Sequence, residues 1–331
     1  MTTIDVSVVL TSYNHAPYLR RAIESVLEQT YEDLELIIVD NGSTDDSPAL
    51  LREFERFPNV IVIRHEANRS HAVICNEGVR AARGAYVGFL FSDDYYLPGK
   101  IEAQMARFAT LPSRTGVVYT GGYFLIEDTG RLVLDRRRKH RGRILETLLT
   151  GAAFILPVSP LYRRQCLLEF PFYEDVSYEG EFILTKIASR YEFDYVEAPL
   201  VVVRENRSSR GKNLDEALAV NLDLYRRFFE SPAFPPECAS LRDRAIAYLM
   251  VLKGWQMIRE RRDYARGGAL IRDALGKDWR RLADYRAVLG TILSAVPAAM
   301  ADIVSNRLDA ARRASRFEGR SLPFGSAKPG G

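Results

Sequence analysis

The first 110 residues alternate between short apolar runs and amphipathic segments of helical length, and this alternation constrains the fold more than any other feature. The apolar runs are residues 6–10, 34–39, 60–63 and 86–91. The segment after the first run opens at Pro17 and places one apolar face on Leu19, Ile23, Val26 and Leu27. Strands that alternate with such helices form a mostly parallel sheet with helices on both faces. The sequence therefore predicts an α/β fold whose ligands gather at the carboxyl ends of the strands.

The pattern changes after about residue 116. A strand is expected over residues 117–125, then a basic stretch at 136–143, an apolar segment at 151–161, a helix at 181–189 and a strand at 199–203. Beyond residue 213 the periodicity is helical almost throughout, with helices expected near 242–261 and 264–275.

Composition excludes several classes of partner and compartment. The 46 basic and 43 acidic residues leave a net charge of only +3, so no nucleic-acid partner is predicted. Three cysteines without paired spacing predict free thiols in a reducing compartment. The chain shows neither a signal peptide nor eighteen consecutive apolar residues. We expect a cytoplasmic protein, with peripheral contact at the inner face of a membrane left open.

Polar side chains follow three of the predicted strands, and parallel strand ends would bring them to one crevice. The first strand ends in Thr11-Ser12-Tyr13-Asn14, the second opens at Asp40, and the fourth runs into Asp93-Asp94. A carboxylate at Asp40 can accept a hydrogen bond from a base N–H such as uracil N3. Adjacent carboxylates are costly unless a divalent cation joins them, and Mg²⁺ takes one or two carboxylates plus phosphates. The alternatives are a helix-capping turn after Asp40 and a solvated turn at Asp93-Asp94.

These blocks carry a family resemblance. Residues 6–14 (VSVVLTSYN), 38–46 (IVDNGSTDD), 76–78 (NEG), 84–94 (GAYVGFLFSDD) and 97–98 (LP) resemble, in order and spacing, the nucleotide-sugar half of family 2 glycosyltransferases with the GT-A fold. The match is strong over about residues 4–110 and looser to about 206. It implies a Rossmann-like, mostly parallel sheet in two halves, nucleotide-sugar-binding (1–115) and acceptor-binding (116–212). A helical C-terminal region (213–318) and a disordered tail (319–331) are expected to follow.

The resemblance also implies an activity. The expected reaction is an inverting, metal-dependent hexosyl transfer from a nucleotide diphosphate donor, UDP favoured, to a hydroxyl of a glycan or lipid-linked acceptor. Mn²⁺ or Mg²⁺ would be the cofactor, and polysaccharide synthesis at the cell envelope the setting. The sugar, the acceptor and the oligomeric state are not predicted.

Site residues follow from the resemblance position by position. The residues expected to bind the donor are Thr11, Tyr13, Asn14, Asp40, Asn68, Arg69, Asn76 and Asp93. Among them, Thr11 and Tyr13 would enclose the base and ribose, and Arg69 would offset charge on the diphosphate. Asp93 and Asp94 match the metal-binding Asp-x-Asp element, with Asp94 the direct ligand. Phe91 stands where many relatives have the first Asp of that element.

The catalytic base is expected just before the helix at 181–189. The family places a Glu-Asp pair before an aromatic residue there, with the Asp as base, whereas the ungapped match here puts Gly180 at the Asp position. A shift by one residue puts Glu181 there. Residues two apart on a helix point about 200° from each other, so Glu179 and Glu181 cannot both face the crevice. We favour Glu181 as the base over Glu179; the alternative for either is a helix-terminal glutamate favoured by the dipole.

Other readings stay open. The basic stretch is either a solvated loop or a grip for an anionic acceptor near the site entrance. His71 and Cys75 share a helix face and could bind zinc only with two further ligands. A dinucleotide oxidoreductase would need G-x-G-x-x-G after the first strand, which is absent. Phe91 and Gly180 also allow a catalytically silent sugar-nucleotide-binding or scaffold protein.

Overall fold

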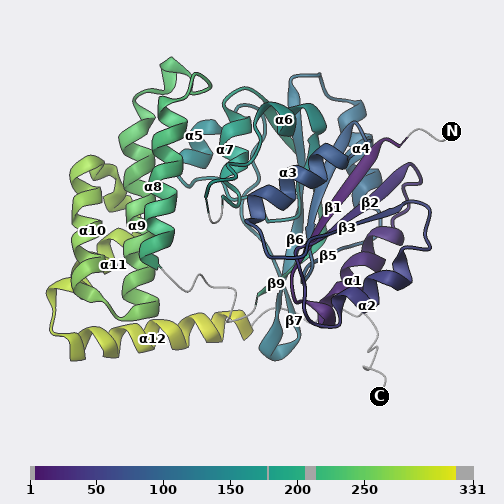
Figure 1. The fold of residues 1–331 in the computed structure, drawn as a ribbon. Coiled ribbons are helices and arrows are strands. Elements are labelled where there is room, and N and C mark those ends of the chain that lie inside the picture. Colours follow the sequence, from purple (N-terminus) through teal and green to yellow (C-terminus); the bar gives the residue numbers. More distant parts are fainter. Residues whose placement is uncertain (1–3, 177–178, 206–213, 318–331) are drawn as a thin grey trace.

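The computed structural model describes residues 4–176, 179–205 and 214–317, with side chains as far as residue 308. Figure 1 shows two parts side by side, a sheet flanked by helices and a stack of helices formed by the C-terminal third of the chain.

Within the described residues nine strands form one curled sheet in the order β3-β2-β1-β4-β8-β6-β9-β5, with β7 added to the edge of β6. The strands are β1 (Val6–Ser12), β2 (Leu34–Asp40), β3 (Val60–Arg64), β4 (Tyr86–Phe91), β5 (Tyr95–Tyr96), β6 (Thr115–Ile126), β7 (Arg131–Leu134), β8 (Leu161–Arg163) and β9 (Glu192–Glu205). Strands β1 to β4 pair in parallel, as do β6 and β9. The short strands β5, β7 and β8 pair antiparallel.

Helices cover both faces of the sheet because its central strands are apolar on both sides. In β1, Val8 and Leu10 belong to one hydrophobic cluster and Val9 to another. The first cluster contains side chains of α1 (Ala16–Leu27), α2 (Ser47–Phe54) and α4 (Lys100–Ala109). The second contains side chains of α3 (His71–Ala81), α5 (Leu145–Leu149), α6 (Arg164–Glu169) and α7 (Phe182–Ala188). The predicted α/β architecture is confirmed.

Agreement with the sequence is closest in the first 110 residues, where every expected strand and helix is present. The strand expected at 199–203 is wrong in extent, because β9 begins seven residues earlier, at Glu192. Its first half carries Glu192, Asp194 and Glu197, which hide the apolar pattern, and it forms because β6 pairs with its backbone. The strands β5, β7 and β8 are two to four residues long and are too short to show a period.

The C-terminal region is helical, as expected. It comprises α8 (Leu214–Glu230), α9 (Leu241–Arg261), α10 (Tyr264–Lys277), α11 (Tyr285–Ala295) and α12 (Ala298–Phe317), with short 3₁₀ turns η2 (Pro236–Cys238) and η3 (Trp279–Ala283). Helices α9 and α10 approach closely at Gly254 and Gly267, where a Cβ on either glycine would lie within 2.7 Å of the other's carbonyl oxygen. No helix in the described part of the chain is long and apolar enough to cross a bilayer. The expected tail at 319–331 lies outside the described residues.

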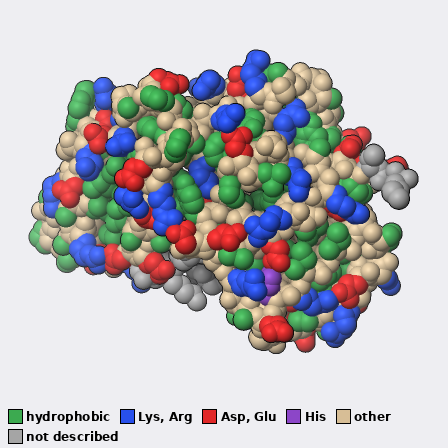
Figure 2. Space-filling model, turned by 45° about the horizontal axis from the view of Figure 1, so that its top comes forward, with side chains coloured by type: hydrophobic (Ala, Val, Ile, Leu, Met, Phe, Trp, Pro, Cys, Tyr) green, Lys and Arg blue, Asp and Glu red, His purple; other side chains and the backbone are tan. Residues whose placement is uncertain are grey.

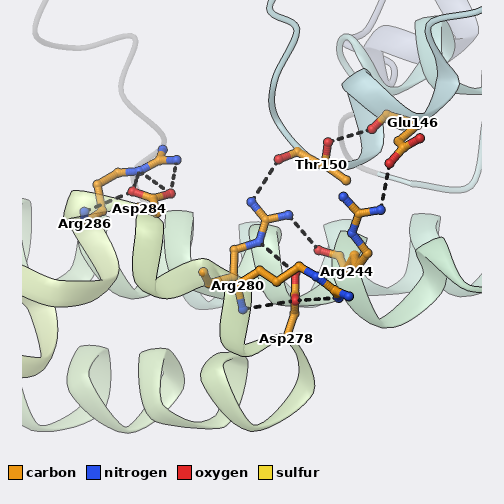
Figure 3. A network of polar contacts seen from close by, with 8 residues as sticks. Glu146, Thr150, Arg244, Asp278, Arg280, Asp284 and Arg286 are labelled. Carbon is orange, nitrogen blue, oxygen red and sulfur yellow. Dashed lines mark hydrogen bonds and ion pairs between the residues drawn. The ribbon is translucent and has the colours of Figure 1, made fainter.

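A polar network fixes the helical region against the sheet part (Figure 3). Arg281 donates hydrogen bonds to the carbonyl oxygens of Thr150 (3.0 Å) and Arg244 (3.2 Å). Arg244 in turn donates to Glu146 of α5 at 2.7 Å. These contacts join η3 and α9 to α5.

Candidate active site

The turns after β1 and β2 are locked together by side-chain hydrogen bonds. Asp40 is almost fully buried beside Ser12 and accepts a hydrogen bond from the Ser43 hydroxyl. Asn14, at φ +52°, donates its backbone N–H to that hydroxyl (2.9 Å) and accepts the Thr44 N–H at its Oδ1 (2.7 Å). The two turns therefore present Asp40 and Asn14 as one rigid edge. Beside it Thr11 is buried, whereas Tyr13 is 42% exposed.

Asn68 and Arg69 lie in the loop that leads into α3. Asn41 donates its side-chain amide to Asn68 Oδ1 and to the Arg69 carbonyl, both at 2.9 Å, and accepts the Arg69 N–H. This fixes the loop against the end of β2. The Arg69 side chain is exposed and has no ion-pair partner among the described residues. Its charge is therefore available to a ligand.

Asn76 is buried on α3 and its amide is committed to the protein. It donates to the Phe172 carbonyl and to Glu174, each at 2.9 Å, and its Oδ1 accepts the Phe172 N–H. Both N–H bonds of the amide are therefore in use. Asn76 holds the segment that leads to Glu179 and Glu181.

Asp93 and Asp94 follow β4 and meet the far end of β9. Asp94 is buried and accepts the backbone N–H of Arg204 at 2.8 Å, while the Arg204 guanidinium donates to the Asp93 carbonyl at 3.2 Å. Burial and the charge of Asp93 hold the pKa of Asp94 well above its usual range, and the charge of Glu181 adds to this effect. The charge of Glu181 therefore acts on Asp94, although the two residues are 87 positions apart in the sequence.

This pair of carboxylates fits a hard divalent cation in chemistry. Burial is the main cause of the raised pKa of Asp94, and a cation would offset both burial and the repulsion from Asp93 that adds to it. Among the described residues no three His, Cys, Asp or Glu side chains gather as a complete ligand set. Within the described residues, His71 and Cys75 therefore lack the two further ligands that a zinc site would need. Any cation at Asp93 and Asp94 would complete its shell with phosphate oxygens and water, as Mg²⁺ commonly does.

Glu179 and Glu181 have opposite environments. Glu179 is buried, with its Oε1 2.7 Å from Lys186 Nζ and its Oε2 accepting the Tyr173 N–H at 2.5 Å. Glu181 has an exposed side chain that lines a cavity. Protein atoms around the cavity displace water from the neighbourhood of the carboxylate, and this desolvation raises the pKa of Glu181. The two side chains diverge because Gly180 between them adopts φ +56°, a conformation that glycine takes without strain.

The structure corrects the expected start of the helix at 181–189. The expected helix begins at Phe182, so neither glutamate lies in its first turn, and Glu181 is its N-cap residue. The opposite orientations come from the backbone at Gly180 and not from helical spacing.

The cavity beside Glu181 is mostly apolar and joins three parts of the chain. Its lining includes Phe91 at the end of β4, His71 at the start of α3, and Leu156. The rings of His71 and Phe91 lie 5.2 Å apart, and Thr11 Oγ1 is 3.5 Å from His71 Nε2. Burial lowers the pKa of His71 to about 4, so its ring is neutral at physiological pH. The carboxylate of Glu181 thus faces a wall without opposing charge.

Arg204 is the site residue that sequence reasoning missed. Its guanidinium lies 4.5 Å from the centre of the Tyr18 ring, and Tyr18 donates to Glu127. No local pattern marks it, since it sits 110 residues after Asp94 and reaches that residue only through the pairing of β5 with β9.

We expect Arg204→Ala to weaken binding of UDP with Mn²⁺ about tenfold, which is about 1.4 kcal/mol. The backbone N–H to Asp94 survives this change, but the contact to the Asp93 carbonyl and the positive charge are lost. Titration calorimetry measures the effect. Arg114→Ala is the control because it breaks an ion pair with Glu192 at the other end of β9. Equal affinities of the Arg204 and Arg114 variants would contradict this role.

Comparison with known proteins decides the family. The model of glycosyl transferase family 2 matches residues 7–168, which include the turns after β1, β2 and β4. Residues 7–168 form a family 2 glycosyltransferase domain. The chain is 30% identical over 223 residues to the putative glycosyltransferase EpsH of Bacillus subtilis, covering 63% of each protein. It spans less than two thirds of the length of EpsH and of several other curated glycosyltransferases.

Solved structures confirm the GT-A fold of this glycosyltransferase domain. The chain resembles S. aureus TarS 1–349 in complex with UDP-GlcNAc, with a TM-score of 0.62, 16% identity and 98% of each chain covered. It also resembles the mannosyltransferase PcManGT from Pyrobaculum calidifontis in complex with GDP-Man and Mn²⁺, with a TM-score of 0.56 and 20% identity over 92% of this chain and 87% of that one. At these identities the likeness concerns the fold alone. The match to TarS 1–349 extends over the helical region as well.

Proposed function

We propose that this glycosyltransferase moves a sugar from a nucleotide diphosphate, preferentially UDP, to a hydroxyl of a glycan or lipid-linked acceptor, with inversion at the anomeric carbon. One observation carries the proposal. Asp40, the Asp93-Asp94 pair and Glu181 come from three separate segments, and the charge of Glu181 acts on Asp94. The TarS structure with UDP-GlcNAc and the PcManGT structure with GDP-Man and Mn²⁺ support a nucleotide-sugar donor.

The donor half would be held by the strand-end turns. Asp40 would accept the base N–H, Thr11, Tyr13 and Asn14 would enclose the base and ribose, and Arg69 with the Asn68 loop would face the diphosphate. Asn76 would act indirectly, through the Phe172 segment. Asp94 and Asp93 would hold Mn²⁺ or Mg²⁺, which when bound offsets the charge that develops on the departing diphosphate.

The acceptor hydroxyl would lose its proton to Glu181. Its oxygen forms the new bond to the anomeric carbon, the bond from that carbon to the diphosphate oxygen breaks, and the nucleotide leaves with the electron pair. A raised pKa makes Glu181 a stronger base than an ordinary carboxylate. Glu179 is the less suitable base because its carboxylate is paired with Lys186 and turned into the protein.

A thermal-shift screen tests the donor assignment. Nucleoside diphosphates and their sugars would be compared with Mn²⁺, with Mg²⁺ and with EDTA. We expect UDP or a UDP-sugar to raise the unfolding midpoint most, and EDTA to remove most of that rise. Equal shifts with and without EDTA would exclude the metal. Binding of a donor without any transfer or hydrolysis would favour the catalytically silent alternative.

The basic stretch at 136–143 supports an anionic acceptor. Arg137 stacks 3.5 Å from the ring centre of Phe154, two residues before Leu156 in the cavity wall. Lys139 pairs with Glu197, and Arg141 lies over Tyr195. Arg136 and Arg138 are exposed and have no ion-pair partner among the described residues. The stretch is therefore attached to the sheet near the cavity and retains uncompensated charge.

Replacing Arg136, Arg137 and Arg138 together by glutamine is expected to raise the acceptor KM about tenfold at low salt, since each cation near an anionic group contributes up to about 1 kcal/mol before screening. Donor affinity should be unchanged, and the difference should vanish near 1 M salt. Initial-rate kinetics against acceptor concentration measure the effect. Gln substitutions at Arg20, Arg21 and Arg52, which are exposed on α1 and α2, remove the same charge elsewhere. An equal KM for both triple variants would contradict acceptor binding by the stretch.

A further inference from the structure

Hydrophobic side chains are exposed mainly at one place, the far end of the helical region. Eight of the twelve large hydrophobic side chains that the described residues expose lie between 279 and 304. We call these eight the apolar corner: Trp279, Leu282, Tyr285, Val288, Ile292, Met300, Ile303 and Val304. Figure 2 shows hydrophobic side chains reaching the surface among basic and acidic side chains at the end of the molecule that holds the helical region.

The three elements of the apolar corner lie next to one another, since α11 contacts both η3 and α12, and each of the two helices exposes a single face. Tyr285, Val288 and Ile292 are spaced by three and four residues on α11, while Ala287, Gly290 and Leu293 on the opposite face are buried. Met300, Ile303 and Val304 share a face of α12, and Ala301 and Ser305 are buried behind them. Helix α11 is thus apolar on both faces, and among the described residues its outward face is largely exposed, with the Tyr285 ring 6.0 Å from that of Trp255.

The chain between the two exposed helix faces carries no charge. Residues 287–301 contain neither Asp, Glu, Lys nor Arg, and they include the corner where α11 turns into α12. In Figure 1 this corner projects from the lower side of the helical region, the side on which β7 and the end of β9 also lie. Without a partner, so much exposed apolar surface on a water-facing corner would be unfavourable.

The charged side chains around the apolar corner indicate which kind of partner fits it. Residues 272–307 contain six basic and four acidic side chains. Asp278 and Asp284 are paired with arginines, and Asp302 accepts a hydrogen bond from Tyr264. Lys277 and Arg280 are exposed beside Trp279, with Arg280 also 3.5 Å from Asp278, and the exposed Asp273 offsets one of these positive charges. A two-fold interface between copies would press this cationic rim against itself, whereas an anionic surface would match it.

We propose that the apolar corner inserts into the interfacial layer of a bilayer that contains anionic phospholipid. Trp279 and Tyr285 have the apolar ring and polar edge that suit the level of the headgroups. Val288, Ile292, Met300 and Ile303 enter the acyl boundary, and Lys277 and Arg280 contact phosphate groups. The protein lies on the membrane through this surface, which includes none of the residues assigned above to the donor or the acceptor.

Vesicle co-sedimentation tests the proposal. We expect the wild-type chain to bind vesicles of phosphatidylcholine with about a quarter phosphatidylglycerol at least tenfold more tightly than phosphatidylcholine alone, because of the cationic rim. The triple variant Ile292→Glu, Met300→Glu, Ile303→Glu should lose that binding by at least tenfold. Leu168→Glu, an exposed leucine on α6, is the matched control and should bind like the wild type. If the triple glutamate variant has a lowered unfolding midpoint, a variant with serine at the same three positions is used in its place.

Fluorescence gives a second readout that does not depend on separation. The chain has two tryptophans, and Trp279 is 69% exposed. Mixed vesicles should shift the emission to shorter wavelength, and Trp279→Phe should remove that shift while leaving sedimentation intact. Equal binding by the triple variant and the Leu168 control would overturn the proposal. So would absence of wild-type binding, or a wild-type dimer in light scattering that the triple variant abolishes, which would assign the corner to a second copy.

Discussion

Replacing Asp94 by asparagine is expected to lower the rate of sugar transfer about a thousandfold, which is about 4 kcal/mol of transition-state stabilisation. Asparagine keeps an oxygen that can accept the Arg204 N–H, so the fold should be retained. It removes the negative charge that a divalent cation requires, and with it the metal-assisted binding of UDP. Transfer assays and calorimetry with and without Mn²⁺ measure the two effects.

Asp46→Asn is the matched control for this experiment. Asp45 and Asp46 are also adjacent carboxylates after a strand of the same sheet, and Asp46 is exposed. Asp45 is committed to the backbone N–H groups of Ala16 and Ser47. The Asp46 variant should retain activity and metal response. If Asp94→Asn and EDTA both leave activity intact, the metal assignment is wrong.

The second large effect is expected at Glu181. Glu181→Gln should reduce kcat about a hundredfold or more, the range that general-base catalysis contributes, with donor affinity nearly unchanged. In the wild type kcat should fall as the pH drops through the raised pKa of Glu181, because the protonated carboxyl cannot accept a proton. This decrease in kcat should occur at higher pH than it would for an ordinary glutamate, and the Glu181→Gln variant should not show it. Steady-state kinetics across pH measure both results.

Glu179→Gln separates the two glutamates. Because it leaves the buried Lys186 without its carboxylate, it should cost about 2 kcal/mol or more of folding stability and lower the unfolding midpoint by several degrees. The folded protein should retain kcat within a few-fold. The reverse pattern, an inactive Glu179 variant and an active Glu181 variant, would make Glu179 the base. Activity in both variants would exclude both glutamates as the base.

Much of the donor half could be predicted from the sequence. Strand and helix periods are local properties, and in residues 6–109 they are unambiguous because the strands are apolar and the helices amphipathic. The motifs that resemble the family lie directly after those strands, so parallel pairing suffices to predict that Asp40 and Asn14 meet. The hydrogen-bond partners of the individual polar side chains could not be predicted. Asn76 illustrates this, since its amide bonds a segment 96 residues away.

Local patterns of about ten residues were sufficient to predict the α/β class, the strand-end turns and the family of residues 7–168. The orientation of the two glutamates could not be predicted in this way, because it depends on the backbone at Gly180, which directs Glu179 to Lys186 and Glu181 to the cavity. The same holds for the contact of Arg204 with Asp94 and for the exposure of Tyr285, Val288 and Ile292 on one face of α11. Contacts between segments that far apart depend on how the whole sheet curls and how the helices stack, which no local pattern encodes.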